Sequence, residues 1–181
     1  MRRRTYLSSI AAVVLTSGCI GGETGQSSSD QMQKSVSVKD ATTSTEMENL
    51  EISVEVPQME ITESDTARIR ISYSNRGDDP IEVNIDPDAP APLSSSEEEP
   101  GLLLLSDAYD PTRASDECWK PEEENFPQPA VVNQYSIEPK QTVELEYDIW
   151  ANAGQEATCI EPGEYQFEPN EGKFVLTVSD E

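Results

Sequence analysis

Histidine is absent from this 181-residue sequence, and only 12 residues are Lys or Arg. Without imidazole the chain cannot build a Ser-His-Asp or Cys-His catalytic group, a histidine-ligated zinc site or a histidine pH switch. The 36 acidic residues leave a net charge of −24, so few side chains could replace the counterions of nucleic-acid phosphates. The composition therefore excludes a nucleic-acid partner and leaves carboxylates as the only abundant reactive groups.

No apolar run in the sequence is long enough to span a bilayer. The longest extends from about Tyr6 to Leu15, follows a basic cluster that ends at Arg4, and precedes small residues. This order of basic, apolar and small residues is typical of a signal peptide. We therefore predict that residues 1–18 are an export signal.

Two short motifs in this region resemble those of prokaryotic lipoproteins. Residues 3–7 (RRTYL) resemble the twin-arginine export motif through Arg3 and Arg4, with Tyr6 where Phe is usual. Residues 16–19 (TSGC) resemble the lipobox, with Thr16 where Leu is usual. The resemblance implies cleavage before Cys19, a lipid on its sulfur, and a protein anchored at the extracytoplasmic face of the cell membrane. The alternative is that Cys19 carries no lipid and the protein is released.

The acidic residues are dispersed along the chain, and only five residues are Lys. This composition resembles that of proteins from extremely halophilic archaea. In dilute buffer such a surface repels itself, whereas salt at 1 M screens charges beyond about 3 Å. High charge with low hydrophobicity is also typical of disorder, but strand-like patterns occupy most of residues 47–181. We therefore expect a folded domain that requires concentrated salt.

Residues 19–46 are rich in Gly, Ser and Thr and lack apolar periodicity. Such a composition predicts a flexible stalk between the anchor and the folded domain. Only Val36 and Val38 suggest a strand there, and the signal is weak. The predicted organisation is a signal peptide over 1–18, a stalk over 19–46 and one domain over 47–181.

Apolar and polar residues alternate in several segments of this domain. The clearest segments are 50–56, 66–73, 81–85 and 143–149, with a further apolar stretch at 174–178. A period of two predicts strands with one face toward a core and one toward water, and no segment has a helical period. We predict an all-β fold, an immunoglobulin-like antiparallel β-sandwich of about seven to eight strands.

The segment 161–167 (EPGEYQF) resembles the corner that enters a late strand in immunoglobulin-like domains. In such corners a tyrosine hydroxyl donates to backbone across the turn, a role that would fall to Tyr165. Cys159 precedes this tyrosine, whereas antibody domains place a cysteine two residues after it. The chain is therefore not an antibody-type domain. An ordinary strand tyrosine is the alternative.

The alternation breaks between residues 86 and 134, in a Pro-rich and acidic stretch that we call the insertion, within which only residues 102–105 predict a buried strand. Long irregular connections often carry function. With Cys19 assigned to lipid, Cys118 and Cys159 form an even pair, which outside the cytoplasm predicts a disulfide. This bridge would tie the insertion to the turn before Tyr165, and Trp119 could pack over it. Neither cysteine has the spacing of a zinc or CxxC redox site.

The carboxylates suggest no specific chemistry. Paired acids can hydrolyse glycosides, but no particular pair stands out, so we predict a non-enzymatic protein without a cofactor. Asp86 with Asp88, or Asp107 with Asp110 and Asp116, could bind Ca²⁺, but none matches an EF-hand loop. Since a solvated acidic surface explains these residues without an ion, no metal site is predicted.

These observations together favour a non-catalytic, lipid-anchored cell-surface module of a halophilic archaeon. Its partners would be the membrane, through the lipid on Cys19, and a protein of the cell envelope. The final 45 or so residues also faintly resemble the small β-sandwich proteinase inhibitors of prokaryotes, so an inhibitor-like protein is the alternative. An enzyme is the third alternative, which a cleft with convergent acids would favour, and a purely structural envelope component is a further one.

Overall fold

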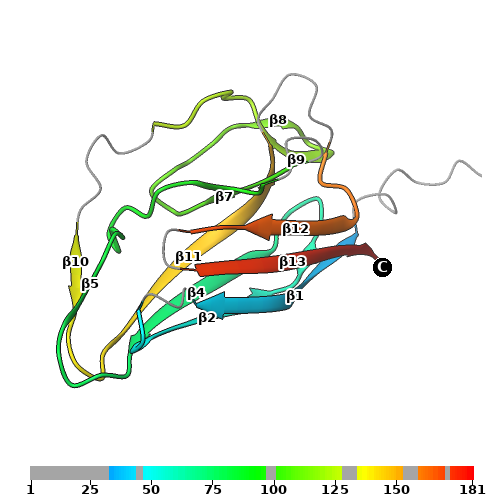
Figure 1. The fold of residues 1–181 in the computed structure, drawn as a ribbon. Coiled ribbons are helices and arrows are strands. Elements are labelled where there is room, and N and C mark those ends of the chain that lie inside the picture. The colour runs from blue at the N-terminus through cyan, green and yellow to red at the C-terminus, as the bar shows by residue number, and fades with distance from the viewer. Residues whose placement is uncertain (1–32, 44–46, 97–100, 128–133, 153–158, 170–171) are drawn as a thin grey trace, which may run out of the picture.

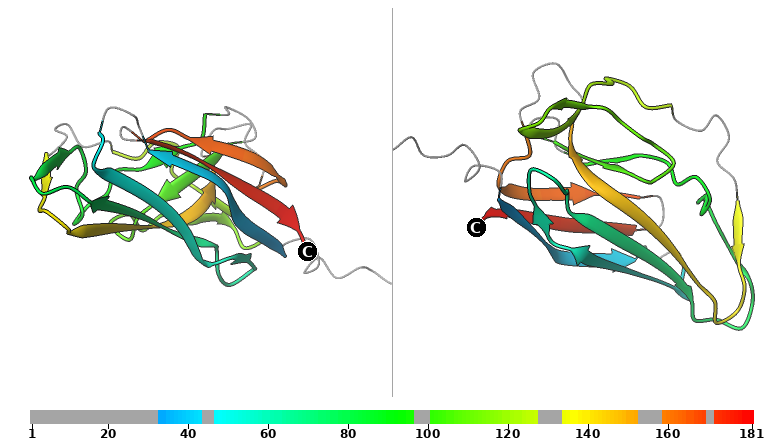
Figure 2. Two further views of the ribbon diagram at one scale, coloured as in Figure 1. Left: turned by 60° about the horizontal axis from the view of Figure 1, so that its bottom comes forward. Right: turned by 180° about the vertical axis from the view of Figure 1, so that it is seen from behind.

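The structure is a computed structural model that describes residues 33–43, 47–96, 101–127, 134–152, 159–169 and 172–181. Over these residues the chain forms β-strands and no helix (Figure 1). Two main sheets lie face to face, as the left view of Figure 2 shows. The prediction of an all-β antiparallel sandwich is therefore confirmed. The strands are more numerous than expected, because several of them are only two to four residues long.

The first main sheet has four antiparallel strands in the order β12-β13-β1-β3. They are β12 (Gly163–Phe167), β13 (Gly172–Asp180), β1 (Lys34–Thr43) and β3 (Glu60–Ile61). Lys34 pairs with Asp180 across β1 and β13, so the two ends of the described chain lie together at one end of the sandwich.

The second main sheet has five antiparallel strands in the order β2-β4-β11-β7-β6. They are β2 (Leu50–Gln58), β4 (Arg68–Asn75), β11 (Thr142–Ala151), β7 (Leu102–Leu105) and β6 (Leu93–Ser94). Two separate strand pairs complete the fold, β5 (Ile81–Val83) with β10 (Tyr135–Ile137), and β8 (Arg113–Ser115) with β9 (Cys118–Pro121).

The sandwich core is made by the inward faces of both main sheets. The predicted alternation holds on β4 and β11, where Ile69, Ile71, Leu145 and Ile149 are buried in one cluster. On the opposite sheet Phe167 pairs with Phe174 across β12 and β13, and their rings stack with centroids 5.0 Å apart. Burial of such side chains contributes roughly 1.5–3 kcal/mol each, so the core supplies the main driving force for this fold.

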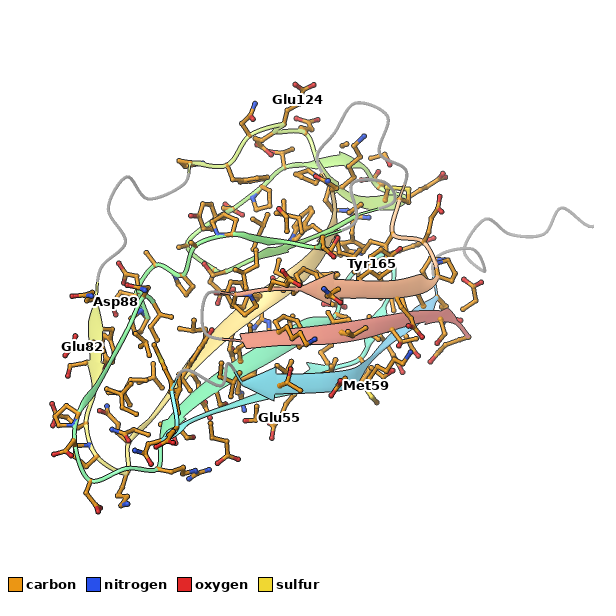
Figure 3. All side chains as sticks on the ribbon, in the orientation of Figure 1. Glu55, Met59, Glu82, Asp88, Glu124 and Tyr165 are labelled. Atoms are coloured by element: carbon orange, nitrogen blue, oxygen red, sulfur yellow. A yellow bond between two sulfur atoms is a disulfide. The ribbon has the colours of Figure 1, made fainter. Side chains whose placement is uncertain are left out.

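The corner before β12 is the one expected from the sequence. The Tyr165 hydroxyl donates to the Glu161 carbonyl at 2.7 Å, and the side chain is buried. The predicted tyrosine corner is therefore confirmed. The bond holds the turn before β12, and Tyr165 itself lies on that strand (Figure 3).

The folded part begins earlier than predicted. Residues 34–43, assigned to the stalk, form β1, which lies between β13 and β3 in the four-stranded sheet. Val36 is buried in the core, and Val38 packs against it. The prediction of a stalk over 19–46 is wrong for this segment, because pairing on both sides stabilises a strand that carries few apolar residues. Of the rest of the predicted stalk, Gln33 is described, whereas residues 19–32 and 44–46 lie outside the described residues.

The buried strand predicted over residues 102–105 is confirmed as β7. The rest of the insertion is more regular than predicted, because it also contributes β6 to the five-stranded sheet and forms the β8–β9 hairpin outside it. Beyond β6, the Ser96 amide donates to the Gln166 carbonyl of β12 at 2.8 Å, which links the edges of the two main sheets. This contact joins the two edges at one point.

Candidate functional site

The strand β7 has a buried residue at each of its four positions, all leucine. Leu102 and Leu104 face the sandwich core, whereas Leu103 and Leu105 form a second cluster with Trp150 of β11. Because successive strand residues point to opposite faces, this second cluster lies on the outer face of the five-stranded sheet. The insertion therefore forms a third layer over part of that face.

The β8–β9 hairpin holds this layer in place through Trp119. Its indole Nε1 donates to the Thr62 carbonyl at 2.7 Å, and its ring meets Trp150 edge to face with centroids 5.2 Å apart. Edge-to-face aromatic pairs add about 0.5–1.5 kcal/mol beyond the area that they bury. The ring thus contacts the outer face of the sheet, and the expectation that Trp119 packs over the disulfide stays a prediction.

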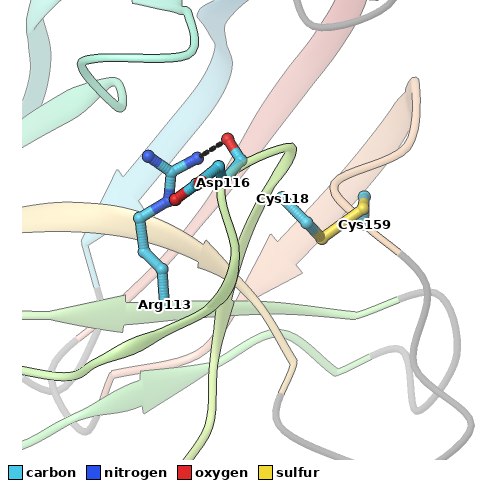
Figure 4. The surroundings of a disulfide bond; sticks show 4 residues. All are labelled: Arg113, Asp116, Cys118 and Cys159. Atoms are coloured by element: carbon cyan, nitrogen blue, oxygen red, sulfur yellow. Dashed lines mark hydrogen bonds between the residues drawn. A yellow bond between two sulfur atoms is a disulfide. The ribbon is translucent and has the colours of Figure 1, made fainter.

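A disulfide joins Cys118 and Cys159, as predicted, and spans 41 residues of sequence (Figure 4). It ties the start of β9 to the segment that precedes β12. The insertion is therefore covalently attached to the part of the chain that leads into the four-stranded sheet. Such a bridge is typical of proteins that fold outside the reducing cytoplasm.

Arg113, the first residue of β8, contacts both Trp119 and the turn of the hairpin. Its guanidinium carbon lies 4.2 Å from the centroid of the Trp119 ring, and Nη1 donates to the Glu63 carbonyl at 2.7 Å. Nη2 donates to the carbonyl of Asp116, a bond drawn in Figure 4. Nε is buried without a hydrogen-bond partner in the described part of the chain. The hairpin therefore contains a cation–π contact between a guanidinium and an indole.

A cleft of about 510 Å³ opens between this layer and the outer face of β7 and β11. We call it the aromatic cleft. Its walls combine aromatic rings, carboxylates and one guanidinium, and the lining residues are Leu105, Ser106, Asp107, Tyr109, Asp110, Pro111, Arg113, Trp119, Asp148 and Trp150.

The carboxylates of the cleft differ in their partners. Asp148 accepts from Arg68 Nε at 2.8 Å, whereas Asp107 approaches Arg68 Nη2 only at 3.5 Å and is 78% exposed. The hydrogen bond to Asp148 is the main cause that raises the pKa of Arg68. Asp110 is exposed at the rim and has no recorded partner among the described residues. Two of the three carboxylates thus retain most of their capacity to accept hydrogen bonds.

Tyr109 forms another wall of the cleft. Its ring meets Phe126 edge to face at 5.9 Å, and its hydroxyl donates to the Pro127 carbonyl at 3.2 Å. Burial raises the pKa of this phenol, so the group stays neutral at ordinary pH. The cleft therefore offers aromatic surface and carboxylate acceptors, which suit non-covalent recognition of a ligand.

Three of the predicted site residues, Arg3, Arg4 and Cys19, lie outside the described residues. Among the described residues, no group of three His, Cys, Asp or Glu side chains converges in a way that could hold a metal ion. The Asp86 carboxylate accepts instead from the backbone amides of Asp88 and Ala89 and so closes its own turn.

No helix in the described part of the chain has the length and apolar character needed to cross a membrane.

Arg113, Trp150 and Asp148 line the cleft but were not predicted as site residues from the sequence. One signal was present, because four consecutive leucines in a strand require cover on both faces and thus predict a layer outside the sheet.

The comparisons with known proteins add no relative to this description. Neither the protein-family models, nor the curated proteins, nor the solved structures contain a match to this chain.

Proposed function

We propose that this protein is a non-catalytic binding module, anchored by a lipid on Cys19 at the extracytoplasmic face of the membrane of a halophilic archaeon. Its recognition surface is the aromatic cleft, through which it binds a protein of the cell envelope. The observation that carries the proposal is the construction of the insertion. A bridged hairpin and a small apolar cluster attach the walls of the cleft to the sheet.

Walls attached in this way favour binding, because less conformational entropy is lost when a partner docks. The disulfide supports a location outside the cytoplasm. Because Lys34 and Asp180 lie at one end of the sandwich, a tether at Cys19 would direct that end toward the membrane. The hairpin is close to this end, since Trp119 bonds Thr62 and the adjacent Ile61 pairs with Lys34.

The anchor is tested by fractionation of cells that express the native chain or a Cys19→Ser variant. We expect the native chain in the membrane fraction and the variant in the medium. Recovery of both forms in the membrane fraction would refute the lipid anchor and leave the cleft to be tested separately.

The binding surface is tested by photo-cross-linking in cells at their own salt concentration. A photoreactive residue replaces either Thr112, which is exposed next to the cleft, or Glu82, which is exposed on β5 (Figure 3). We expect one dominant adduct from position 112 and none from position 82. Equal adducts from both positions, or none from position 112, would overturn the assignment of this surface. The inhibitor-like alternative stays a prediction, and a proteinase inhibition assay in molar salt tests it.

A further inference from the structure

Both tryptophans of the chain line the aromatic cleft. Their rings stand at 78° to each other, and the Arg113 guanidinium lies over one of them at 4.2 Å. A guanidinium is planar and weakly hydrated, so it stacks on an indole more readily than an ammonium does. The structure therefore shows that a face of the Trp119 ring accommodates a guanidinium, although Arg113 itself occupies that face.

The carboxylates around the cleft also favour a guanidinium ligand. Arg68 pairs closely with Asp148, whereas Asp107 lies 3.5 Å from Arg68 Nη2 with its side chain 78% exposed, and Asp110 is exposed at the rim. A carboxylate binds a guanidinium through two parallel hydrogen bonds, a geometry that ammonium groups and simple metal ions do not provide. The cleft thus combines the two kinds of contact by which proteins hold an arginine side chain.

The size of the cleft and the salt conditions agree with this ligand. Its volume of about 510 Å³ is larger than one side chain requires and is within the usual range of ligand sites, roughly 300–1,000 Å³. In molar salt, attraction beyond about 3 Å is screened, so a ligand must be held by direct contacts. Stacking on indole and bonding to a rim carboxylate are both direct contacts.

We infer that the aromatic cleft binds the guanidinium group of an arginine side chain on the protein partner. This inference rests on the proposed function and names the chemistry that the partner must present. Trp150 is only 6% exposed, so the incoming guanidinium contacts the open part of the Trp119 ring beside Arg113 and bonds the rim carboxylates Asp107 and Asp110.

The test uses the purified full-length protein in about 2 M KCl, where charges on its surface are screened. The probes are acetyl-arginine amide, acetyl-lysine amide and acetyl-citrulline amide, of which the last has nearly the shape of arginine without its charge. Because the chain has 2 tryptophans and both line the cleft, the indole N–H signals in NMR spectra report on this site.

We expect saturable shifts of both indole signals with the arginine probe and a dissociation constant of about 1 mM or above, since one side chain makes few contacts. The lysine and citrulline probes should bind several-fold more weakly. Equal binding of arginine and citrulline probes would overturn the inference, as would the absence of any saturable shift.

An Asp110→Asn variant tests whether the arginine probe is bound at the rim of the cleft. Because this residue is exposed, the substitution leaves the fold intact, and we expect it to weaken binding of the arginine probe about two- to fivefold. Glu82→Gln removes the same charge from β5 and should leave binding unchanged. Equal effects of both substitutions would show a general charge effect and refute the site.

The two experiments distinguish failure of the guanidinium inference from failure of the proposed function. A dominant adduct at position 112 without binding of the arginine probe would overturn the guanidinium ligand and keep the binding module. Binding of the arginine probe without an adduct at position 112 would support the ligand chemistry and refute the protein partner.

Discussion

Removal of the Cys118–Cys159 bridge should destabilise the protein by about 4 kcal/mol. The magnitude follows from its sequence separation of 41, because closing a loop of that length lowers the entropy of the unfolded chain by a calculable amount. Since small proteins unfold with only about 5–15 kcal/mol, this is a large part of the total stability. The native contacts of Trp119 and Arg113 do not depend on the bridge and should keep the hairpin folded at low denaturant.

The measurement is urea unfolding of the native chain and of a Cys118→Ala/Cys159→Ala variant at one fixed salt concentration. Urea is preferred to guanidinium chloride because it leaves the ionic strength unchanged. Each single substitution removes the same bond, so Cys118→Ala and Cys159→Ala alone should each cost about as much as the pair. Reduction of the native chain should produce a similar loss without any substitution.

A loss below about 1 kcal/mol would refute the argument from loop closure and show that the unfolded chain is constrained in some other way. Hydrogen exchange separates global from local effects. We expect exchange to increase most in β8, in β9 and around Ile160, where the bridge fastens the insertion. Uniform acceleration across β4 and β11 as well would mean that the insertion unfolds only together with the sandwich.

Three further predictions concern the tyrosine corner, a buried phenol and the surface charge. Tyr165→Phe should lower the free energy of unfolding by about 1 kcal/mol, because it removes the bond to the Glu161 carbonyl, and an unchanged urea midpoint would contradict that role. Burial raises the pKa of the Tyr147 phenol, so its contribution to stability is complete below about pH 10 and is lost as the pH rises further. Tyr147→Phe should therefore show a shallower alkaline loss of stability than the native chain, and equal slopes would refute this. Between about 0.1 and 2 M KCl the stability should rise steadily, since salt screens a net charge of −24, whereas full stability at low salt would contradict the halophilic interpretation.

The alternation of residues predicted most of the main strands correctly. On β4 and β11 every second residue is apolar, and these positions face the core in the structure. Because one face of a strand in such a sheet points toward the core and the other toward water, the period of two can be recognised from neighbouring residues alone. The tyrosine corner could be predicted for a similar reason, because its bond connects residues that are four apart.

β1 could not be predicted with the same assurance. Val36 is buried, but its neighbours Ser35 and Ser37 give no strong strand signal. The strand forms because β13 and β3 supply hydrogen-bond partners on its two sides. Those partners are distant in sequence, and their effect on a weak local preference is a tertiary one.

The aromatic cleft could not be predicted from the sequence either, because its walls come from distant segments. Its walls come from the 105–113 segment, from β9 and from β11, and no local pattern indicates that Trp119 and Trp150 meet. The pairing of Arg68 with Asp148 depends on the register between β4 and β11. Register is decided by the packing of whole strands, so it cannot be read from either segment alone.

By itself, the sequence determined the all-β class, the acidic surface, the absence of imidazole chemistry and the pair of cysteines available for a bridge. These properties follow from composition and from patterns within a few residues. Only the tertiary structure decided where the folded part begins and how the insertion covers the outer face of the sheet. It also decided which rings and carboxylates share a cleft. Such features depend on contacts between segments up to 146 residues apart, whose free energies arise only when the whole sandwich is packed.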